Sequence, residues 1–234
     1  MSEPDNPADV PESSDASSDP LRQRTVVHLL RHGEVHNPRG ILYGRLPDYH
    51  LSELGLRMAE RAAGFFTGRD VTHLVASPLE RAQETAAPTA AALQLPVTTD
   101  ERVTEASNHF EGKTVGVGHG VLKHPSLWWW LRNPVRPSWG EPYKVVAARM
   151  LTAVAAARET ARGHEAVIVS HQLPVWIARM AVEGRSYVHD PRRRQCALAS
   201  VTSITYLGEA VESVSYTEPA ADLLGPADDQ QFGA

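Results

Sequence analysis

The chain has 234 residues, of which 42% are hydrophobic and 22% are charged, proportions typical of a globular protein of one or two domains. Its single cysteine, Cys196, excludes an intrachain disulfide framework, and no apolar run approaches the roughly 18 residues of a membrane span. A basic and then apolar secretion signal is also missing at the start of the sequence. We therefore expect a soluble, cytoplasmic protein that does not associate with membranes.

The net charge of −5 is unevenly distributed. Residues 1–20 contain six acidic residues and no Lys or Arg, so the remainder of the chain carries +1. Residues 218–234 add four acidic residues and no basic one, which leaves +5 on the middle of the chain. A mildly cationic middle suits a small anionic substrate better than a nucleic-acid backbone.

The two ends also differ from the middle in composition. Residues 1–22 are rich in Ser, Pro and Asp and hold too few large apolar residues to offset the entropy of ordering, so we expect a disordered acidic tail. Residues 218–234 are expected to form a second acidic tail, in which Leu223, Leu224 and Phe232 are able to dock. A single domain is predicted for residues 23–217.

The first half of this domain alternates strand-like and helix-like segments. Residues 25–30 form a β-branched and apolar run that predicts a strand. From Ser52, a suitable N-cap, apolar residues recur at helical spacing as far as Phe66. Residues 71–76 predict the next strand, 78–95 a helix with proline near its start, and 97–99 a short strand.

The second half continues the alternation. An alanine-rich helix is predicted over residues 141–162, followed by a buried strand over 165–169 and a helix over 173–183. Residues 197–207 and 211–216 alternate like two strands paired through the intervening turn. Strands separated by helices indicate an α/β fold, here a single three-layer α/β/α domain with a central, mostly parallel sheet flanked by helices.

Charged and imidazole side chains follow three of the predicted strands. Arg31 and His32 follow the first strand, Arg81 lies just beyond the second, and His171 follows the strand over 165–169. Ligands of open α/β sheets bind at the carboxyl ends of the strands, so these side chains are expected to share one crevice. Guanidinium forks match phosphate oxygens, and a neutral histidine is able to attack phosphorus. The pattern therefore favours phosphoryl transfer.

Five segments together resemble the histidine phosphatase superfamily, also called phosphoglycerate mutase-like. They are LRHGE at 30–34, the loop and helix start with Asn37, Gly44 and LSELG at 51–55, SPLERAQET at 77–85, Gly140–Glu141 with Arg149, and VSH at 169–171. The resemblance covers roughly residues 25–216. It implies a phosphoglycerate mutase-like fold and catalysis through phosphohistidine.

The resemblance also implies roles for individual residues. His32 would be the nucleophile, and Arg31, Arg81 and His171 would hold the phosphoryl oxygens and stabilise their charge. Asn37 and Gly44 would add substrate contacts in the loop after the signature. Glu105 is the candidate proton donor, and Glu111 is the alternative. Glu34 is expected only to orient the loop.

No metal and no cofactor are expected. The residues His28, His32 and His36 are spaced four apart and would form a zinc-binding face on a helix. The apolar, β-branched residues between them favour a strand instead, and Gly33 would interrupt a helix.

Two further segments have more than one interpretation. Trp128, Trp129 and Trp130 suit either an apolar cap or dimer surface, or a lid that faces the substrate. Arg192, Arg193 and Arg194 form a basic run that suits a solvated loop or the binding of a second anionic group of a substrate. Neither segment indicates nucleic-acid binding. A homodimer is possible, and the oligomeric state stays open.

The expected function is hydrolysis of a small phosphorylated metabolite by a metal-independent phosphatase. Two alternatives remain. A bisphosphoglycerate-dependent phosphoglycerate mutase would carry a Phe-Thr-Gly-Trp type of loop after the signature, whereas this chain has Tyr43-Gly44-Arg45-Leu46. A non-catalytic module that binds a phosphorylated ligand would need neither a nucleophile nor a proton donor.

Overall fold

The computed structural model describes residues 23–113, 140–190 and 193–224. The predicted tail over residues 1–22, the Trp128–Trp130 segment, Arg192, and Phe232 with the rest of 225–234 lie outside these described residues. The domain boundaries at 22/23 and 217/218 stay predictions. Within the described ranges, no helix is both long and apolar enough to cross a bilayer.

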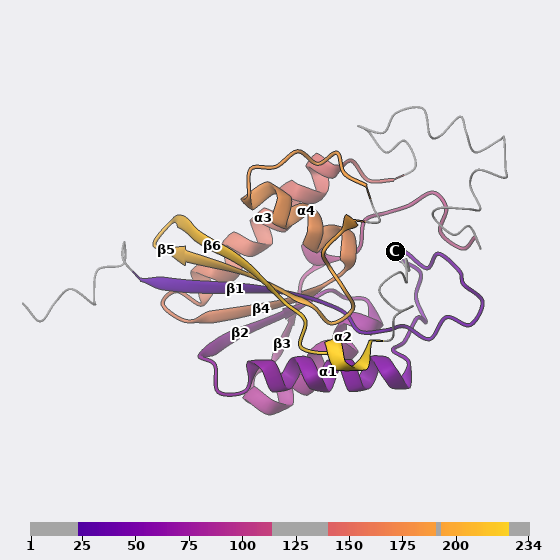
Figure 1. Ribbon diagram of the computed structural model, residues 1–234, viewed down its shortest axis with the longest axis horizontal. Helices are drawn as coiled ribbons and strands as arrows, with labels where there is room; N and C mark the ends of the chain where they lie inside the picture. The colour runs from indigo at the N-terminus through magenta and orange to yellow at the C-terminus, as the bar shows by residue number, and fades with distance from the viewer. Residues whose placement is uncertain (1–22, 114–139, 191–192, 225–234) are drawn as a thin grey trace, which may run out of the picture.

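A six-stranded sheet forms the centre of the described structure (Figure 1). Its strands, in spatial order, are β3 (Val97–Thr99), β2 (Val71–Ala76), β4 (Glu165–Ser170), β1 (Arg24–Arg31), β5 (Val201–Leu207) and β6 (Ala210–Thr217). The pairs β3–β2, β2–β4 and β4–β1 are parallel, whereas β5 runs antiparallel to both β1 and β6. The carboxyl ends of β1, β2 and β4 therefore lie at the same edge of the sheet.

Helices cover both faces of the sheet and complete the predicted α/β/α layers. Figure 1 shows α1 (Glu53–Phe66) and α2 (Glu80–Leu93) on one face, and α3 (Tyr143–Thr160) and α4 (Gln172–Val182) on the other. Short 3₁₀ turns are η2 (Glu101–Val103) and η7 (Ala221–Leu223). This arrangement confirms the predicted fold class.

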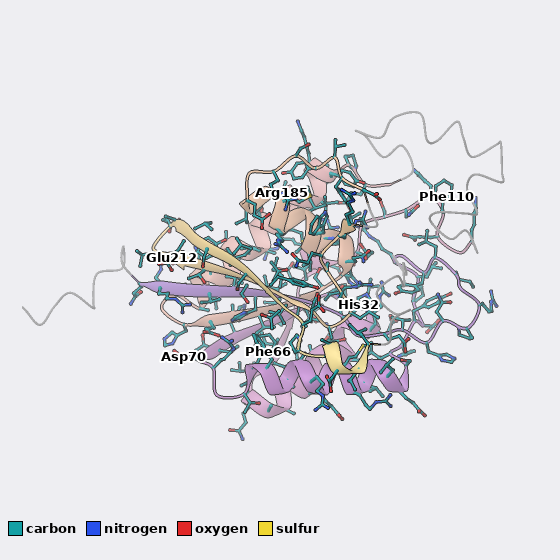
Figure 2. All side chains as sticks on the ribbon, viewed as in Figure 1. His32, Phe66, Asp70, Phe110, Arg185 and Glu212 are labelled. Carbon is teal, nitrogen blue, oxygen red and sulfur yellow. The ribbon has the colours of Figure 1, made fainter. Side chains whose placement is uncertain are left out.

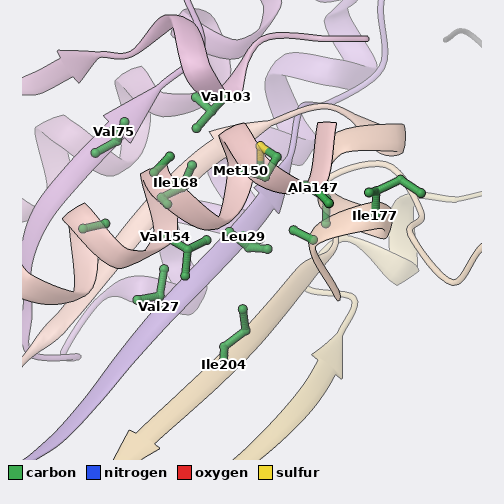
Figure 3. Packing of buried hydrophobic residues seen from close by; sticks show 14 of the residues in the cluster. Val27, Leu29, Val75, Val103, Ala147, Met150, Val154, Ile168, Ile177 and Ile204 are labelled. Atoms are coloured by element: carbon green, nitrogen blue, oxygen red, sulfur yellow. The ribbon is translucent and has the colours of Figure 1, made fainter. Parts of the chain in front are cut away.

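The alternation of side chains along β1 explains the two cores. Val27 and Leu29 point into the core under α3 and α4 (Figure 3), whereas Leu30 belongs to the core under α1 and α2. All three side chains are fully buried. A strand with apolar residues on both faces needs a helical layer on each side, because each face must leave water.

Three predicted elements begin later than expected. The helix predicted from residue 141 begins at Tyr143, with Pro142 as its N-cap. The helix predicted from residue 78 begins at Glu80, since Leu79 still has extended backbone as its N-cap. The strand predicted from residue 197 begins at Val201, because residues 197–200 form a turn in which Ala199 has a φ of +52°. The turn places Cys196 and Ser200 next to the carboxyl end of β1, where Arg31 N–H donates to Ser200 C=O at 3.0 Å.

The predicted docking of two C-terminal leucines is present in the structure. Leu223 and Leu224 are partly buried and pack with Leu54 against the buried residues Met58 and Ala220. This small cluster joins the segment after β6 to α1.

Candidate active site

The three strand ends bring the predicted side chains into one buried pocket. His32 follows β1, and Figure 2 shows it at the middle of the molecule, at the ends of the strands. Arg81 lies in the first turn of α2, and His171 is the N-cap of α4, directly after β4. Arg31, His32, Arg81 and His171 are each at most 3% exposed. The rings of His32 and His171 are 5.2 Å apart between centroids.

The backbone of Gly33 determines which nitrogen of His32 is free. Nδ1 donates a hydrogen bond to the Gly33 carbonyl at 2.7 Å, whereas the buried Nε2 has no partner among the described residues. Burial, followed by the charges of Arg81 and Arg31, holds the pKa of His32 well below its usual value of 6.5. The imidazole is therefore neutral at physiological pH and offers an Nε2 lone pair.

Arg31 and Arg81 each use part of their guanidinium to hold the pocket together. Arg31 Nη1 donates to the Cys196 carbonyl at 2.7 Å, and Arg81 Nη2 donates to the Gly44 carbonyl. The remaining buried nitrogens have no partner among the described residues; they are Nε and Nη2 of Arg31 and Nε and Nη1 of Arg81. Buried donors without acceptors are costly, so these nitrogens indicate a site built for an anion.

His171 is held by Ser77, which the sequence marks only as a member of the second arginine motif. The Nε2 atom of His171 lies 2.8 Å from Ser77 Oγ, and both side chains are fully buried. When the hydroxyl donates to Nε2, the proton of the neutral ring resides on Nδ1, which has no partner in the described structure. Burial lowers the pKa of His171 well below 6.5, with Arg81 contributing next. His171 then presents a neutral N–H donor.

Glu105 has the properties of a proton donor. Its side chain is 2% exposed; Oε1 accepts the Ala106 N–H at 2.8 Å, and Oε2 is buried without a described partner. Burial raises the pKa of this carboxyl above its usual value of 4.5. Glu111, the alternative donor, is less buried, and its Oε1 accepts the Asn108 N–H at 3.0 Å.

A network of ion pairs fixes the backbone around Glu105. Arg149 donates from Nη1 to the carbonyls of Arg102, at 2.7 Å, and Thr104, at 2.6 Å, and it pairs with Glu141 at 2.9 Å. Arg45 pairs with the same carboxylate at 2.9 Å and donates from Nε to the Glu105 carbonyl at 2.6 Å. The Gly140–Glu141 and Arg149 motif residues therefore position the candidate acid.

Two motif glycines are explained by one close contact between loops. A Cβ on Gly33 would lie 2.6 Å from the Gly55 carbonyl oxygen, and a Cβ on Gly55 would lie 2.0 Å from the Glu34 carbonyl oxygen. Ser52 caps α1 as predicted, because its Oγ accepts the Gly55 N–H at 3.0 Å. The Ser52 hydroxyl also donates to the Glu34 carboxylate, so Glu34 fastens the signature loop to the start of α1.

Tyr43 and Thr85 are two site residues that sequence reasoning missed. The Arg81 guanidinium lies over the Tyr43 ring, 4.7 Å from its centroid, and the same ring meets His32 edge-on at 6.5 Å. Thr85 Oγ1 accepts the Gly33 N–H at 3.1 Å and donates to the Arg81 carbonyl at 2.7 Å. The only signal for either was membership of a motif-bearing segment.

The expected substrate contacts of Asn37 and Gly44 stay predictions. The Asn37 side chain closes its own loop, since it accepts the Ile41 N–H at 3.0 Å and donates to the Ile41 carbonyl at 2.7 Å. Gly44 has a φ of +44°, and its carbonyl accepts a hydrogen bond from Arg81. A Cβ at this position would collide with the Glu111 side chain. Both residues therefore shape the loop that covers the pocket.

His28, His32 and His36 do not form the zinc-binding face that the sequence argued against. His28 lies within β1, where Nδ1 contacts Ser203 Oγ at 2.7 Å and Nε2 contacts Glu165 Oε2 at 2.9 Å, so neither ring nitrogen is shared with His32 or His36. In the described ranges, no three His, Cys, Asp or Glu side chains gather to form a metal-binding group.

Comparisons with known proteins agree with this geometry. The profile of the histidine phosphatase superfamily (branch 1) matches residues 27–219, so the chain belongs to this superfamily. The uncharacterized protein Rv0525 of Mycobacterium tuberculosis is 56% identical over 201 residues, which cover 86% of this chain and all of that protein. A probable phosphoglycerate mutase, GpmB of Yersinia pestis, is 29% identical and covers 75% of this chain and 83% of its own length.

A solved structure extends the likeness to the fold. Mycobacterial glucosyl-3-phosphoglycerate phosphatase superposes with a TM-score of 0.62 at 25% identity, covering 83% of this chain and 97% of its own. The solved structure is thus named as a phosphatase, and the Yersinia relative as a probable mutase. A buried neutral histidine beside two arginines with free nitrogens suits the transfer of a phosphoryl group, which is the chemistry that both activities share.

Proposed function

We propose that the protein is a phosphatase that hydrolyses a small phosphorylated metabolite, a phosphomonoester, through a phosphohistidine at His32. One observation carries the proposal. Among the described residues, the buried His32 Nε2 has no hydrogen-bond partner, and neither do two nitrogens of Arg31 and two of Arg81, whose charges act on His32. A phosphoryl group that occupied this pocket would satisfy those donors and stand next to the nucleophile.

In the first step, the His32 Nε2 lone pair attacks phosphorus as the bond from phosphorus to the alcohol oxygen breaks. Arg31, Arg81 and the Nδ1–H of His171 stabilise the negative charge on the three phosphoryl oxygens. The protonated Glu105 carboxyl gives its proton from Oε2 to the leaving oxygen. Its raised pKa supports this role, because the carboxyl stays protonated to a higher pH than an exposed one.

In the second step, water attacks the phosphohistidine. The Glu105 carboxylate, left by the first step, accepts a proton from that water as the oxygen bonds to phosphorus and the bond to Nε2 breaks. Inorganic phosphate forms, His32 returns to its neutral state, and Glu105 is again protonated. The guanidiniums of Arg31 and Arg81 supply the positive charge for both steps, so the proposed reaction is metal-independent.

Hydrolysis of para-nitrophenyl phosphate in excess EDTA tests the proposal. We expect turnover by the wild type and none by His32→Ala, because no nucleophile remains. His164→Ala is the matched control, since His164 is an exposed histidine that bonds Asp70 at the opposite edge of the sheet. Wild-type turnover by His32→Ala, or loss of turnover in EDTA that added metal restores, would refute the mechanism.

A second assay distinguishes a phosphatase from a mutase. The protein is incubated with 3-phosphoglycerate, with and without 2,3-bisphosphoglycerate, and both inorganic phosphate and 2-phosphoglycerate are measured. Release of phosphate without 2-phosphoglycerate supports the proposal, whereas efficient bisphosphate-primed isomerisation would replace it with the mutase. Tight phosphate binding without turnover on a broad panel of phosphomonoesters would instead indicate a binding module.

A further inference from the structure

Arg194 lies at the rim of the same pocket, in the segment between α4 and β5. Its Nη1 donates to Gln172 Oε1 at 3.3 Å, and its Nε donates to His189 Nε2 at 2.9 Å. Gln172 directly follows His171 and is buried as the first residue of α4. Two neutral side chains therefore hold the guanidinium beside the phosphoryl pocket.

The partners of Arg194 do not neutralise its charge. His189 Nδ1 donates to the Tyr187 carbonyl at 2.7 Å, so Nε2 is the acceptor and the ring is neutral; burial lowers the pKa of this imidazole. No ion pair among the described residues includes Arg194, and no described residue accepts a hydrogen bond from its Nη2. A half-buried cation without a carboxylate partner is costly, and an anionic ligand would offset that cost.

The neighbours of Arg194 indicate which part of a substrate it would meet. Arg194 donates to Gln172, which follows His171. It also lies two residues before Cys196, whose carbonyl accepts from Arg31, so this segment borders the site. Burial raises the pKa of Glu105 and lowers that of Arg194, and the opposite charges of the two groups partly offset both shifts. Glu105 is the proposed proton donor to the leaving oxygen. Arg45 and Arg149, two other guanidiniums near Glu105, are already bonded to backbone carbonyls and to the Glu141 carboxylate. Arg194, by contrast, has no carboxylate partner among the described residues.

We infer that Arg194 binds a second anionic group in the alcohol part of the substrate, so that the enzyme prefers phosphomonoesters whose leaving group carries a carboxylate or a second phosphate. The free Nη2 and the second N–H of Nη1 form a fork that matches two oxygens of either group. This inference rests on the proposed function, because Glu105 identifies the leaving-group side only if it is the acid. Arg194 is then a specificity residue and takes no part in the transfer of protons.

Matched substrates test the inference. Values of kcat/KM are compared between 3-phosphoglycerate and glycerol 3-phosphate, and between phosphoserine and phosphoethanolamine; each pair differs in one carboxylate. Fructose 1,6-bisphosphate against fructose 6-phosphate tests a second phosphate. Arg194→Gln should lower kcat/KM about 10- to 100-fold on the preferred anionic members, the worth of one charged hydrogen bond, and less than about 3-fold on the others.

The control variant is Arg193→Gln, which removes an exposed neighbouring arginine and should leave every ratio unchanged. Para-nitrophenyl phosphate, which has no second anion, reports whether Arg194→Gln still folds and turns over. Equal losses by Arg194→Gln on both members of every pair would make Arg194 a positioning residue for Glu105 and overturn the inference. Unchanged ratios would overturn it as well.

A binding measurement separates failure of this inference from failure of the proposed function. Calorimetric titration of the His32→Ala protein with 3-phosphoglycerate and glycerol 3-phosphate needs no turnover. With Arg194→Gln added, the affinity for 3-phosphoglycerate should fall and that for glycerol 3-phosphate should not. If the wild type does not hydrolyse para-nitrophenyl phosphate but the affinity for 3-phosphoglycerate alone still depends on Arg194, only the phosphatase proposal is refuted. The same loss for both ligands would refute the anion site.

Discussion

Replacing Thr85 by valine tests how the nucleophile is held. The hydroxyl accepts the Gly33 N–H at 3.1 Å, and the Gly33 carbonyl accepts the His32 Nδ1–H at 2.7 Å, so Thr85 orients the backbone that selects the imidazole tautomer. Valine keeps the shape but leaves a buried N–H without its acceptor, which costs about 1–3 kcal/mol. The free energy of unfolding in urea should fall by that amount with an unchanged m-value.

The kinetic effect of Thr85→Val should exceed what the loss of stability explains. With the Gly33 peptide released, Nε2 no longer faces phosphorus in one orientation, and kcat should fall about 10- to 100-fold at a temperature where the variant is folded. Thr85→Ser is the control, because it keeps the hydroxyl and loses one methyl group, at about 0.8 kcal/mol. Wild-type kcat for the valine variant, or an equal loss for the serine variant, would contradict this account.

Three other changes have outcomes that follow from the structure. In the wild type, kcat/KM on an alkyl phosphate should fall as pH rises through the raised pKa of Glu105; Glu105→Gln should be slow and should lack this alkaline limb, and a retained limb would assign it to another group. Gly55→Ala should lower the free energy of unfolding by about 3 kcal/mol, since its Cβ meets a backbone oxygen at 2.0 Å, whereas Gly64→Ala, with nothing within 4 Å, should raise it by about 0.5–1 kcal/mol. The hydrogen bond from His28 lowers the pKa of Glu165, so that pair stabilises the fold above the ordinary carboxyl pKa and loses this contribution as pH falls through the lowered one. Urea midpoints measured from pH 7 to pH 3 should therefore decline more steeply for the wild type than for Glu165→Gln.

The architecture was predictable from the sequence because its signals are local. Apolar, β-branched runs predicted the strands, and helical periodicity between them predicted the covering helices. The delayed start of β5 was not predictable in this way, since the apolar residues Ala197, Leu198 and Ala199 lead directly into the strand-like run that follows. Their turn depends on Arg31, whose backbone and guanidinium bond to Ser200 and Cys196 from the neighbouring strand.

The topology of the sheet made it predictable that the main site residues lie close together. The residues that support them were not predictable. Parallel strands end at one edge of a sheet, which brings Arg31, His32 and His171 together without any knowledge of their contacts. The roles of Tyr43 and Thr85 depend instead on side-chain contacts across loops and helices that no local pattern encodes. The same holds for the ion pair between Arg45 and Glu141, which are 96 residues apart along the chain.

The charges of Arg81 and Arg31 also act on His32, the proposed nucleophile. A histidine as buried as His32 would already resist protonation, and the charges of Arg81 and Arg31 lower its pKa further, which keeps the Nε2 lone pair available in mildly acidic solution. Burial also raises the pKa of Glu105, so this carboxyl stays protonated to a higher pH than an exposed one. Burial therefore lowers the pKa of His32 and raises that of Glu105. Both shifts favour the protonation states that the proposed first step needs, an unprotonated Nε2 and a protonated carboxyl. One desolvated pocket thus prepares both halves of the first step before any substrate binds.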